Sequence, residues 1–161
     1  MYTRSLFIFR QDLRLQDNTA LLEAMRTSNQ VFPIFIHDTR AIEDFWVDDP
    51  RFGFIREVLE LVDQELQKYG GRVTVYRWNP EIIIPELIEQ YKIDAVFLNT
   101  SYSPRWKNRD ESIMTYCDRS GVEFHSYQDF LLVEPQEVEQ RKVFTPFSLL
   151  WKKFLVSHPE R

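Results

Sequence analysis

Residues 6–18 read LFIFRQDLRLQDN, an apolar run that leads directly into alternating charged residues and an Asp-Asn pair. Residues 6–9 are short and rich in aromatic side chains, which is typical of a strand buried on both faces of a parallel sheet. The charges that follow lie at the carboxyl end of this strand, where open α/β sheets have their ligand crevice. We therefore expect Arg10, Asp12 and Arg14 to lie beside such a crevice.

The chain lacks the glycines that usually accompany this position. It contains four glycines in 161 residues, and none of them forms a phosphate-binding loop. Nucleotides in such crevices are normally held by the backbone N–H groups of a glycine-rich loop. The sequence therefore predicts a nucleotide-type scaffold that holds its ligand by side chains, or holds none.

Strand and helix patterns alternate along the first 130 residues. Strands are predicted at residues 6–9, 31–36, 72–77, 94–98 and 122–127, and each interval between them carries a helical pattern. This alternation predicts a parallel sheet with right-handed crossovers and helices on both faces. Because the first strand is entirely apolar, we place it in the centre. The expected fold is a three-layer, Rossmann-like open α/β sheet of strand order 3-2-1-4-5.

Two segments fall outside the regular pattern. A loop of about a dozen residues, with Phe45 and Trp46, follows the second strand, and connections of that length are often functional. After residue 130 the chain is irregular and then forms an apolar helix around Trp151 and Phe154. Such a helix should be covered by another part of the protein. We therefore expect an α/β domain at residues 1–130, and in residues 131–161 the start of a linker to a further domain.

Composition excludes several protein classes. A hydrophobic fraction of 43% and an aromatic fraction of 15% indicate a folded globule. No window of the sequence approaches about 18 uninterrupted apolar residues, so we expect no membrane span. Cys117 is the only cysteine, so no internal disulfide forms, which fits a reducing cytoplasm. The net charge is −5, and the basic residues at 105–109 are followed directly by acidic ones. Because DNA binding needs a clustered basic face, we expect none from this chain alone.

Two motifs near the ends of the chain carry a family resemblance. FIFRQDLRLQDNTAL at residues 7–21 and KVFTPF at residues 142–147 resemble the opening and the exit of the N-terminal domain in the DNA photolyase and cryptochrome family. Arg51-Phe52 and Arg109-Asp110 match the same family between them. The resemblance implies an α/β domain that carries, or once carried, a light-harvesting antenna. It also implies a following helical domain, outside this chain, that holds FAD and the groove for damaged DNA.

The resemblance also implies an activity for the whole protein. In that family an excited reduced flavin donates an electron to a pyrimidine dimer in damaged DNA, the ring opens and the electron returns. We therefore expect part of a light-driven deoxyribodipyrimidine photolyase, monomeric at full length. The chain alone is expected to be non-catalytic and to hold no cofactor. A cryptochrome-type blue-light photoreceptor stays open as an alternative, and a small nucleotide-binding α/β module is a less favoured one.

Candidate site residues follow the strand ends. We expect the first-turn charges to be mainly structural, with Arg10 as the one that touches a ligand. His37 without a neighbouring Cys or second His is a poor metal ligand, so no metal site is predicted. For Asp38, loop capping and a chromophore hydrogen bond stay equally open. The predicted ligand contacts are Arg10, Phe35, Ile36, His37, Asp38, Arg51, Asn99, Ser101, Tyr102, Ser103 and Trp106.

The family resemblance does not determine which antenna chromophore would bind. Relatives that hold a deazaflavin or a flavin tend to have acidic residues at the places of Ser101 and Ser103, and relatives that hold a folate tend to have a Glu near Trp106. This chain has none of these carboxylates. Deazaflavin, FMN and methenyltetrahydrofolate are all candidates, and loss of the antenna is the alternative. The Trp106 indole could stack on a flat ring.

Overall fold

The structure is a computed structural model that describes residues 1–42 and 50–159. The predicted loop aromatics Phe45 and Trp46 lie outside the described residues. The chain divides into two compact units, residues 1–129 and residues 130–161. The first unit contains the sheet.

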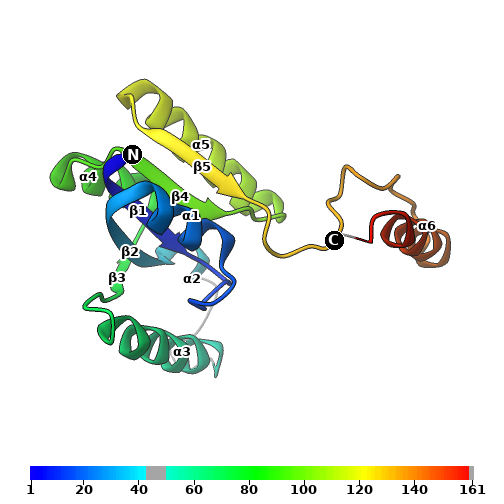
Figure 1. Ribbon diagram of the computed structural model, residues 1–161, viewed down its shortest axis with the longest axis horizontal. Coiled ribbons are helices and arrows are strands. Elements are labelled where there is room, and N and C mark those ends of the chain that lie inside the picture. Colours follow the sequence, from blue (N-terminus) through cyan, green and yellow to red (C-terminus); the bar gives the residue numbers. More distant parts are fainter. Residues whose placement is uncertain (43–49, 160–161) are drawn as a thin grey trace. The chain divides into compact units, whose positions relative to one another are not determined.

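Five parallel strands form one sheet (Figure 1). They are β1 (Tyr2–Phe9), β2 (Ser28–Asp38), β3 (Thr74–Trp78), β4 (Ala95–Asn99) and β5 (Glu123–Tyr127). The spatial order is β3-β2-β1-β4-β5, and all four strand pairs are parallel. The predicted α/β class and the order 3-2-1-4-5 are therefore confirmed. The central strand β1 is buried from Ser5 to Phe9, as its apolar sequence indicated.

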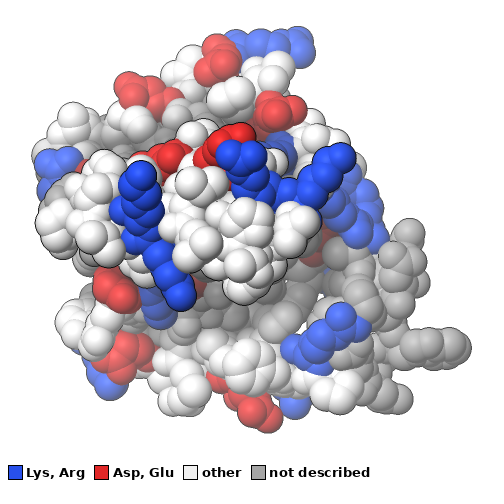
Figure 2. All heavy atoms as spheres, turned by 90° about the vertical axis from the view of Figure 1, so that its right-hand side faces the viewer, with Lys and Arg blue, Asp and Glu red and all other residues white. Residues whose placement is uncertain are grey.

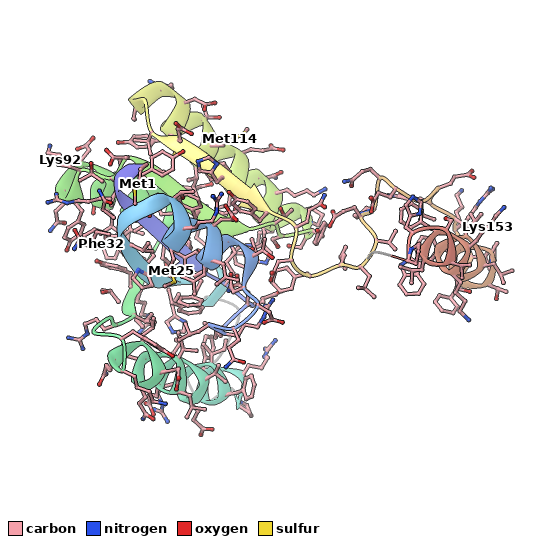
Figure 3. All side chains as sticks on the ribbon, in the orientation of Figure 1. Met1, Met25, Phe32, Lys92, Met114 and Lys153 are labelled. Carbon is pink, nitrogen blue, oxygen red and sulfur yellow. The ribbon has the colours of Figure 1, made fainter. Side chains whose placement is uncertain are left out.

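Helices cover both faces of the sheet and give it three layers. On one face, α1 (Thr19–Thr27) and α3 (Pro50–Gln67) pack on a core that includes Phe7, Phe9 and Phe97. On the other face, α4 (Pro80–Tyr91) and α5 (Pro104–Ser120) pack on a core that includes Leu6 and Ile8. Side chains of alternate β1 residues thus pack on opposite faces of the sheet, because successive side chains of a strand point in opposite directions. Figure 3 labels Met25 on α1 and Met114 on α5, the exposed methionines of the two layers.

Helices α1, α4 and α5 begin at residues that are typical of helix starts. The side chain of Asn18 accepts a hydrogen bond from the Leu21 N–H and caps α1. Proline occupies the first turn of both α4 and α5, where its missing N–H is not needed. Gly121 ends α5 in the left-handed conformation, with φ of 70°, which a glycine adopts without strain.

The second strand and the loop after it differ from expectation. Strand β2 is longer than the predicted 31–36, and Pro33 lies within it although β2 is an inner strand. Pairing with β3 begins only at Ile34, so β2 still has an open side at Pro33. Helices occupy both ends of the stretch that was predicted to be an irregular loop, because α2 (Thr39–Ile42) follows β2 directly and α3 begins at Pro50.

The second unit contains α6 (Phe144–Ser157), and none of its residues is buried. Phe144, Leu149 and Val156 are among its exposed apolar side chains. Phe154 stacks on His158 with ring centroids 4.1 Å apart. Neither α6 nor any other helix in the described ranges is long and apolar enough to cross a membrane.

Candidate ligand-binding site

A cavity of about 420 Å³ lies at the carboxyl ends of β1 and β2, with further walls from α3, α4 and α5. Most of its walls are apolar, and the polar groups are few. Cavities of this kind are typical of small-molecule sites, in which a small number of polar groups orient the ligand. The apolar lining residues are Ile8, Phe9, Leu13, Phe35, Ile36, Phe52, Phe54, Ile55, Pro80, Ile84 and Ile113. The others are Arg10, Gln11, His37, Asp38, Arg51, Ser101, Trp106 and Arg109.

Most of the predicted contact residues meet in this cavity. The predicted residues that line it are Arg10, Phe35, Ile36, His37, Asp38, Arg51, Ser101 and Trp106. Asn99, Tyr102 and Ser103 are not part of its lining. The residues that line it without having been predicted include Phe52 and Arg109, which the sequence analysis named only as motif positions.

Most N–H groups of the Arg10 guanidinium form hydrogen bonds within the protein. Its Nη2 lies 2.6 Å from Asp110 Oδ1, and its Nη1 lies 2.8 Å from Asp110 Oδ2. Nη1 also donates to the backbone oxygen of Asn99 at 3.2 Å. The side chain is only 8% exposed, and within the described residues its buried Nε has no hydrogen-bond partner. Arg10 therefore joins β1 to β4 and α5 through three of its five N–H groups, and the Nε–H and one Nη2 N–H remain for other acceptors.

A buried network of amide and carboxylate groups holds the strand ends together behind the cavity. Asn99 Nδ2 donates to Asp12 Oδ2 at 2.5 Å and to Asn18 Oδ1 at 2.9 Å. Asn99 Oδ1 accepts from the Ala20 N–H at 3.1 Å. With both donors and its oxygen engaged, the Asn99 side chain joins β4 to β1 and to the start of α1. Buried polar groups with all their partners in place rigidify a structure.

Arg14 anchors the same region from the surface side. It pairs with Asp17 at 2.8 Å and with Asp129 at 2.7 Å. Burial raises the pKa of Asp129, but the hydrogen bonds from Thr19 and the charge of Arg14 outweigh it, so this pKa lies below its ordinary value. Thr19 donates to Asp129 through both its N–H and its hydroxyl. These contacts fit the structural role predicted for Arg14.

Asp38 has a capping role at the end of β2. Its Oδ1 accepts from the Arg40 N–H at 3.0 Å, which caps the short helix α2. The side chain is 2% exposed and also pairs with the Arg40 guanidinium, which reaches on to Glu81 at 2.7 Å. Hydrogen bonding to Asp38 raises the pKa of Arg40 despite partial burial. Of the two alternatives for Asp38, loop capping is therefore realised, and its carboxylate still borders the cavity.

His37 is a half-buried member of the cavity wall. Its ring meets Phe35 edge-on with centroids 4.9 Å apart, and it lies 6.2 Å from the Phe52 ring. Burial, assisted by the nearby charge of Arg77, lowers the pKa of His37 below its ordinary value of 6.5. The imidazole is therefore neutral at pH 7 and contributes an aromatic surface rather than a charge.

Arg109 is the main polar residue that the sequence prediction missed. Its guanidinium carbon lies 4.5 Å from the centre of the Trp106 ring, in cation–π contact. Its Nε and Nη2 both donate to Asp110 Oδ1, at 3.1 and 3.0 Å. Burial, together with the charge of Arg10, lowers its pKa to about 10, so it is still a cation at pH 7. The i, i+3 spacing of Trp106 and Arg109 on a predicted helix was the signal that could have found this pair.

A second groove lies at the amino ends of the strands. Figure 3 labels Met1 and Lys92 at this end of the sheet. Ile88, Ile93 and Glu123 are among the groove's lining residues. Beside it, Tyr2 donates to Glu123 at 2.6 Å, and burial, followed by this hydrogen bond, raises the pKa of Tyr2 to about 12. This groove is more polar than the cavity and is separate from it.

Comparison with known proteins identifies the family. The family model described as DNA photolyase matches residues 5–160. The chain belongs to the DNA photolyase family. The resemblance drawn from residues 7–21 and 142–147 is thereby confirmed.

Similar proteins of this photolyase family include both repair enzymes and cryptochromes. Cryptochrome-1 of Aedes aegypti is 31% identical over 144 residues, which is 86% of this chain and 26% of the relative. A deoxyribodipyrimidine photo-lyase of Synechococcus is 27% identical over 152 residues, which is 91% of this chain and 31% of the relative. The chain therefore spans less than a third of the length of these relatives.

Solved structures of the photolyase family match the α/β fold. The archaeal photolyase of Sulfolobus tokodaii, described with two FAD molecules and a novel light-harvesting cofactor, is 34% identical with a TM-score of 0.79. The match covers 93% of this chain and 35% of that one. A class III photolyase of Agrobacterium tumefaciens is 26% identical with a TM-score of 0.75, over 91% of this chain and 31% of that one.

Proposed function

We propose that this chain is the antenna-binding α/β domain of a light-driven DNA photolyase, and that its cavity holds a flavin as the antenna. The observation that carries the proposal is the largely apolar cavity at the carboxyl ends of β1 and β2, bordered by Trp106 and Arg109. The Sulfolobus relative supports it, because the structure of that protein has two FAD molecules, with the implication of a novel light-harvesting cofactor.

The residues of the cavity fit a flat ring system. Aromatic and aliphatic walls, among them Phe35, Phe52 and Ile84, remove the faces of such a ring from water. Trp106 is half-buried, so part of its indole is accessible for stacking. The Nε of Arg10 is a buried donor without a partner in the described residues, which is the kind of group that a ligand acceptor satisfies.

The polar groups of the cavity can hold a flavin, and the choice of a flavin over a deazaflavin or a folate rests on the Sulfolobus relative. The carboxylates that relatives with a flavin, a deazaflavin or a folate tend to have at Ser101 and Ser103 or near Trp106 are all missing from this chain, so they do not separate the three candidates. The cavity instead presents guanidinium groups, from Arg51 and Arg109. Guanidinium groups donate to carbonyl and phosphate oxygens, both of which FMN and FAD carry.

The chain's own residues would bind the flavin, orient it and exclude water from it. When bound, an antenna supplies absorption of blue light and passes the excitation to a second chromophore. The buried network of Asp12, Asn18 and Asn99 keeps the strand ends in place behind the cavity, so the ring would have one defined orientation. Defined orientation matters because energy transfer between chromophores depends on it.

FAD and damaged DNA are proposed as partners of the whole protein, outside this chain. The net charge of this chain is −5. On the face in view in Figure 2, Lys and Arg side chains occur among Asp and Glu side chains. A mixed surface of this kind does not favour the phosphate backbone. We therefore assign DNA contact and the catalytic flavin to other parts of the protein.

A cryptochrome is the second candidate for the whole protein. Cryptochrome-1 of Aedes aegypti and that of Drosophila melanogaster are 31% and 32% identical to this chain. The cavity of this chain would be the same in either case, so the two candidates are separated by what the whole protein does. Illumination of the full-length protein with DNA that contains pyrimidine dimers separates them, since only a photolyase restores the pyrimidines.

Titration of the chain with chromophores tests the cavity assignment. FMN, FAD, a deazaflavin and methenyltetrahydrofolate are each added, and binding is followed by chromophore fluorescence. Ser101→Trp fills the cavity wall, whereas Ser103→Trp adds the same ring at an exposed neighbour outside the lining. We expect a flavin to bind most tightly, Ser101→Trp to weaken it about tenfold, and Ser103→Trp to change it less than about twofold. Equal effects of the two variants would place the flavin elsewhere.

A further inference from the structure

Arg10 and Arg109 share the carboxylate of Asp110 but differ in which of their N–H donors are unused. Asp110 accepts from two nitrogens of Arg10 and two of Arg109. Two cations on one carboxylate leave one positive charge in this cluster. Arg10 Nη1 also donates to the Asn99 backbone oxygen. Within the described ranges, the hydrogen bonds of Arg109 come from its Nε and Nη2, which leaves the Nη1 N–H groups for a further acceptor.

The position of Arg109 also limits how a ligand can stack on the indole of Trp106. The guanidinium lies over one face of the indole at 4.5 Å from the ring centre, and both residues line the cavity. A ligand that stacks on Trp106 would use the part of this half-buried ring that Arg109 leaves accessible. Trp106 and Arg109 are one turn apart on α5, so one element of the fold presents both groups to the same ligand.

We propose that Arg109 and Trp106 act as one recognition element for the ring of the chromophore: the indole stacks on the ring, and Arg109 Nη1 donates to a ring carbonyl oxygen. The inference rests on the proposed function and deepens it. It assigns the main polar contact with the ligand to Arg109, whereas the sequence predicted Arg10, at the end of the first strand, for that contact.

The surroundings of Arg109 favour a ring carbonyl over a phosphate. The cavity is walled mainly by aliphatic and aromatic groups, including Ile113 one turn further along the same helix. Burying a phosphate there would cost much more hydration free energy than burying a neutral ring with a carbonyl edge. A carbonyl oxygen beside a cation forms a charge-assisted hydrogen bond, which is stronger than a neutral one. Arg51, by contrast, is exposed at the start of α3, where a phosphate can keep its water.

Riboflavin and FMN separate the two contacts, because they share the ring and only FMN carries a phosphate. Both are titrated against the chain and against Arg109→Gln and Trp106→Leu, with flavin fluorescence as the readout. We expect each variant to weaken riboflavin and FMN by the same factor, about tenfold. The double variant should lose little more than either single one, since the two residues act as a unit. Trp106→Leu should also relieve the quenching of flavin fluorescence by the stacked indole.

Matched controls keep the test interpretable. Arg105→Gln removes an exposed arginine 5.9 Å from the same indole, and Trp78→Leu removes an exposed tryptophan on β3; neither residue lines the cavity, so both should bind flavin normally. Trp106→Leu leaves the ion pairs of Asp110 intact, so it tests the proposal even if Arg109→Gln does not fold.

Three outcomes would contradict the inference in different ways. A loss in Arg109→Gln that is confined to FMN would make Arg109 a phosphate contact and overturn it. Normal binding of both flavins by a folded Trp106→Leu would overturn it while leaving the proposed function standing. Failure of the unsubstituted chain to bind either flavin would refute the proposed function, and this inference with it.

Discussion

Arg10 and Asp110, 100 residues apart in sequence, form a two-pronged ion pair at the edge of the sheet, with nitrogen–oxygen distances of 2.6 and 2.8 Å. The pair joins the end of β1 to α5, and the two side chains are 8% and 17% exposed. Arg109 adds a second cation to the same carboxylate. Asp110 is therefore the group that holds both guanidiniums of the cavity wall in place.

Removing the Asp110 charge should destabilise the fold. Asp110→Asn leaves two nearly buried cations without a counter-ion, and loss of one partner in a buried ion pair costs about 3 kcal/mol of unfolding free energy. Urea unfolding followed by circular dichroism measures it. Asp118→Asn, at an exposed position of the same helix, is the control and should change the unfolding free energy by less than about 0.5 kcal/mol. Similar values for the two variants would contradict a structural role for the ion pair.

Removing the buried Asn99 amide should lower the unfolding free energy by a comparable amount. Asn99→Ala leaves Asp12, Asn18 and the Ala20 N–H each without one hydrogen-bond partner. Unsatisfied buried polar groups cost about 1 to 3 kcal/mol each, so we expect a loss of at least about 2 kcal/mol in unfolding free energy. Asn108→Ala, on the exposed side of α5, serves as the comparison and should be nearly neutral. A stable Asn99→Ala protein would show that the network does not hold the strand ends.

His37 predicts a pH dependence of stability. Its pKa is lowered in the folded state, first by burial and then by Arg77, so between 6.5 and the lowered value the unfolded chain binds more protons than the folded one. Unfolding free energy should therefore fall as the pH is lowered below about 6.5. His37→Phe, which keeps an aromatic ring beside Phe35 and Phe52, should remove this part of the pH dependence. An NMR titration that gives His37 a pKa of 6.5 or above would refute the prediction.

Arg51 predicts a difference between phosphorylated and unphosphorylated flavins. Its exposed position on the cavity lining suits the phosphate of FMN. Arg51→Gln should weaken FMN about fivefold, reduce the salt dependence of FMN binding, and leave riboflavin unchanged. Arg56→Gln, at an exposed position of the same helix, is the matched control. Equal losses for FMN and riboflavin would show that Arg51 acts on the ring or on the fold.

The sequence predicted the sheet and much of the cavity for one physical reason. In a parallel α/β sheet the alternation of elements determines which strand ends meet, so Arg10, His37 and Asp38 could be placed together from their positions alone. Side-chain pairing could not be foreseen in the same way. The commitment of Arg10 to Asp110 depends on a contact across 100 residues. The three hydrogen bonds of the Asn99 side-chain amide likewise depend on partners, at Asp12, Asn18 and Ala20, that come together only in the folded chain.

Helix faces explain the remaining differences. Arg109 lies far along the chain from the first-strand motif, and the packing of α5 places it in the cavity wall one turn after the predicted contact Trp106. The extra length of β2 at both ends has a similar origin, since pairing with β1 starts at Ser28 and pairing with β3 ends at Asp38. Neighbouring strands thus extend an element beyond what its own residues predict.

Methyl NMR of the chain during an FMN titration tests the central claim, that the antenna occupies the cavity at the carboxyl ends of the strands. Ile8, Ile84 and Ile113 line that cavity, whereas Ile88 and Ile93 line the groove at the other end of the same sheet. The account predicts that FMN shifts the δ1 methyl signals of the first three, through the ring current of the flavin, and leaves the other two unchanged. Shifts confined to Ile88 and Ile93, or no shifts at millimolar FMN, would contradict it.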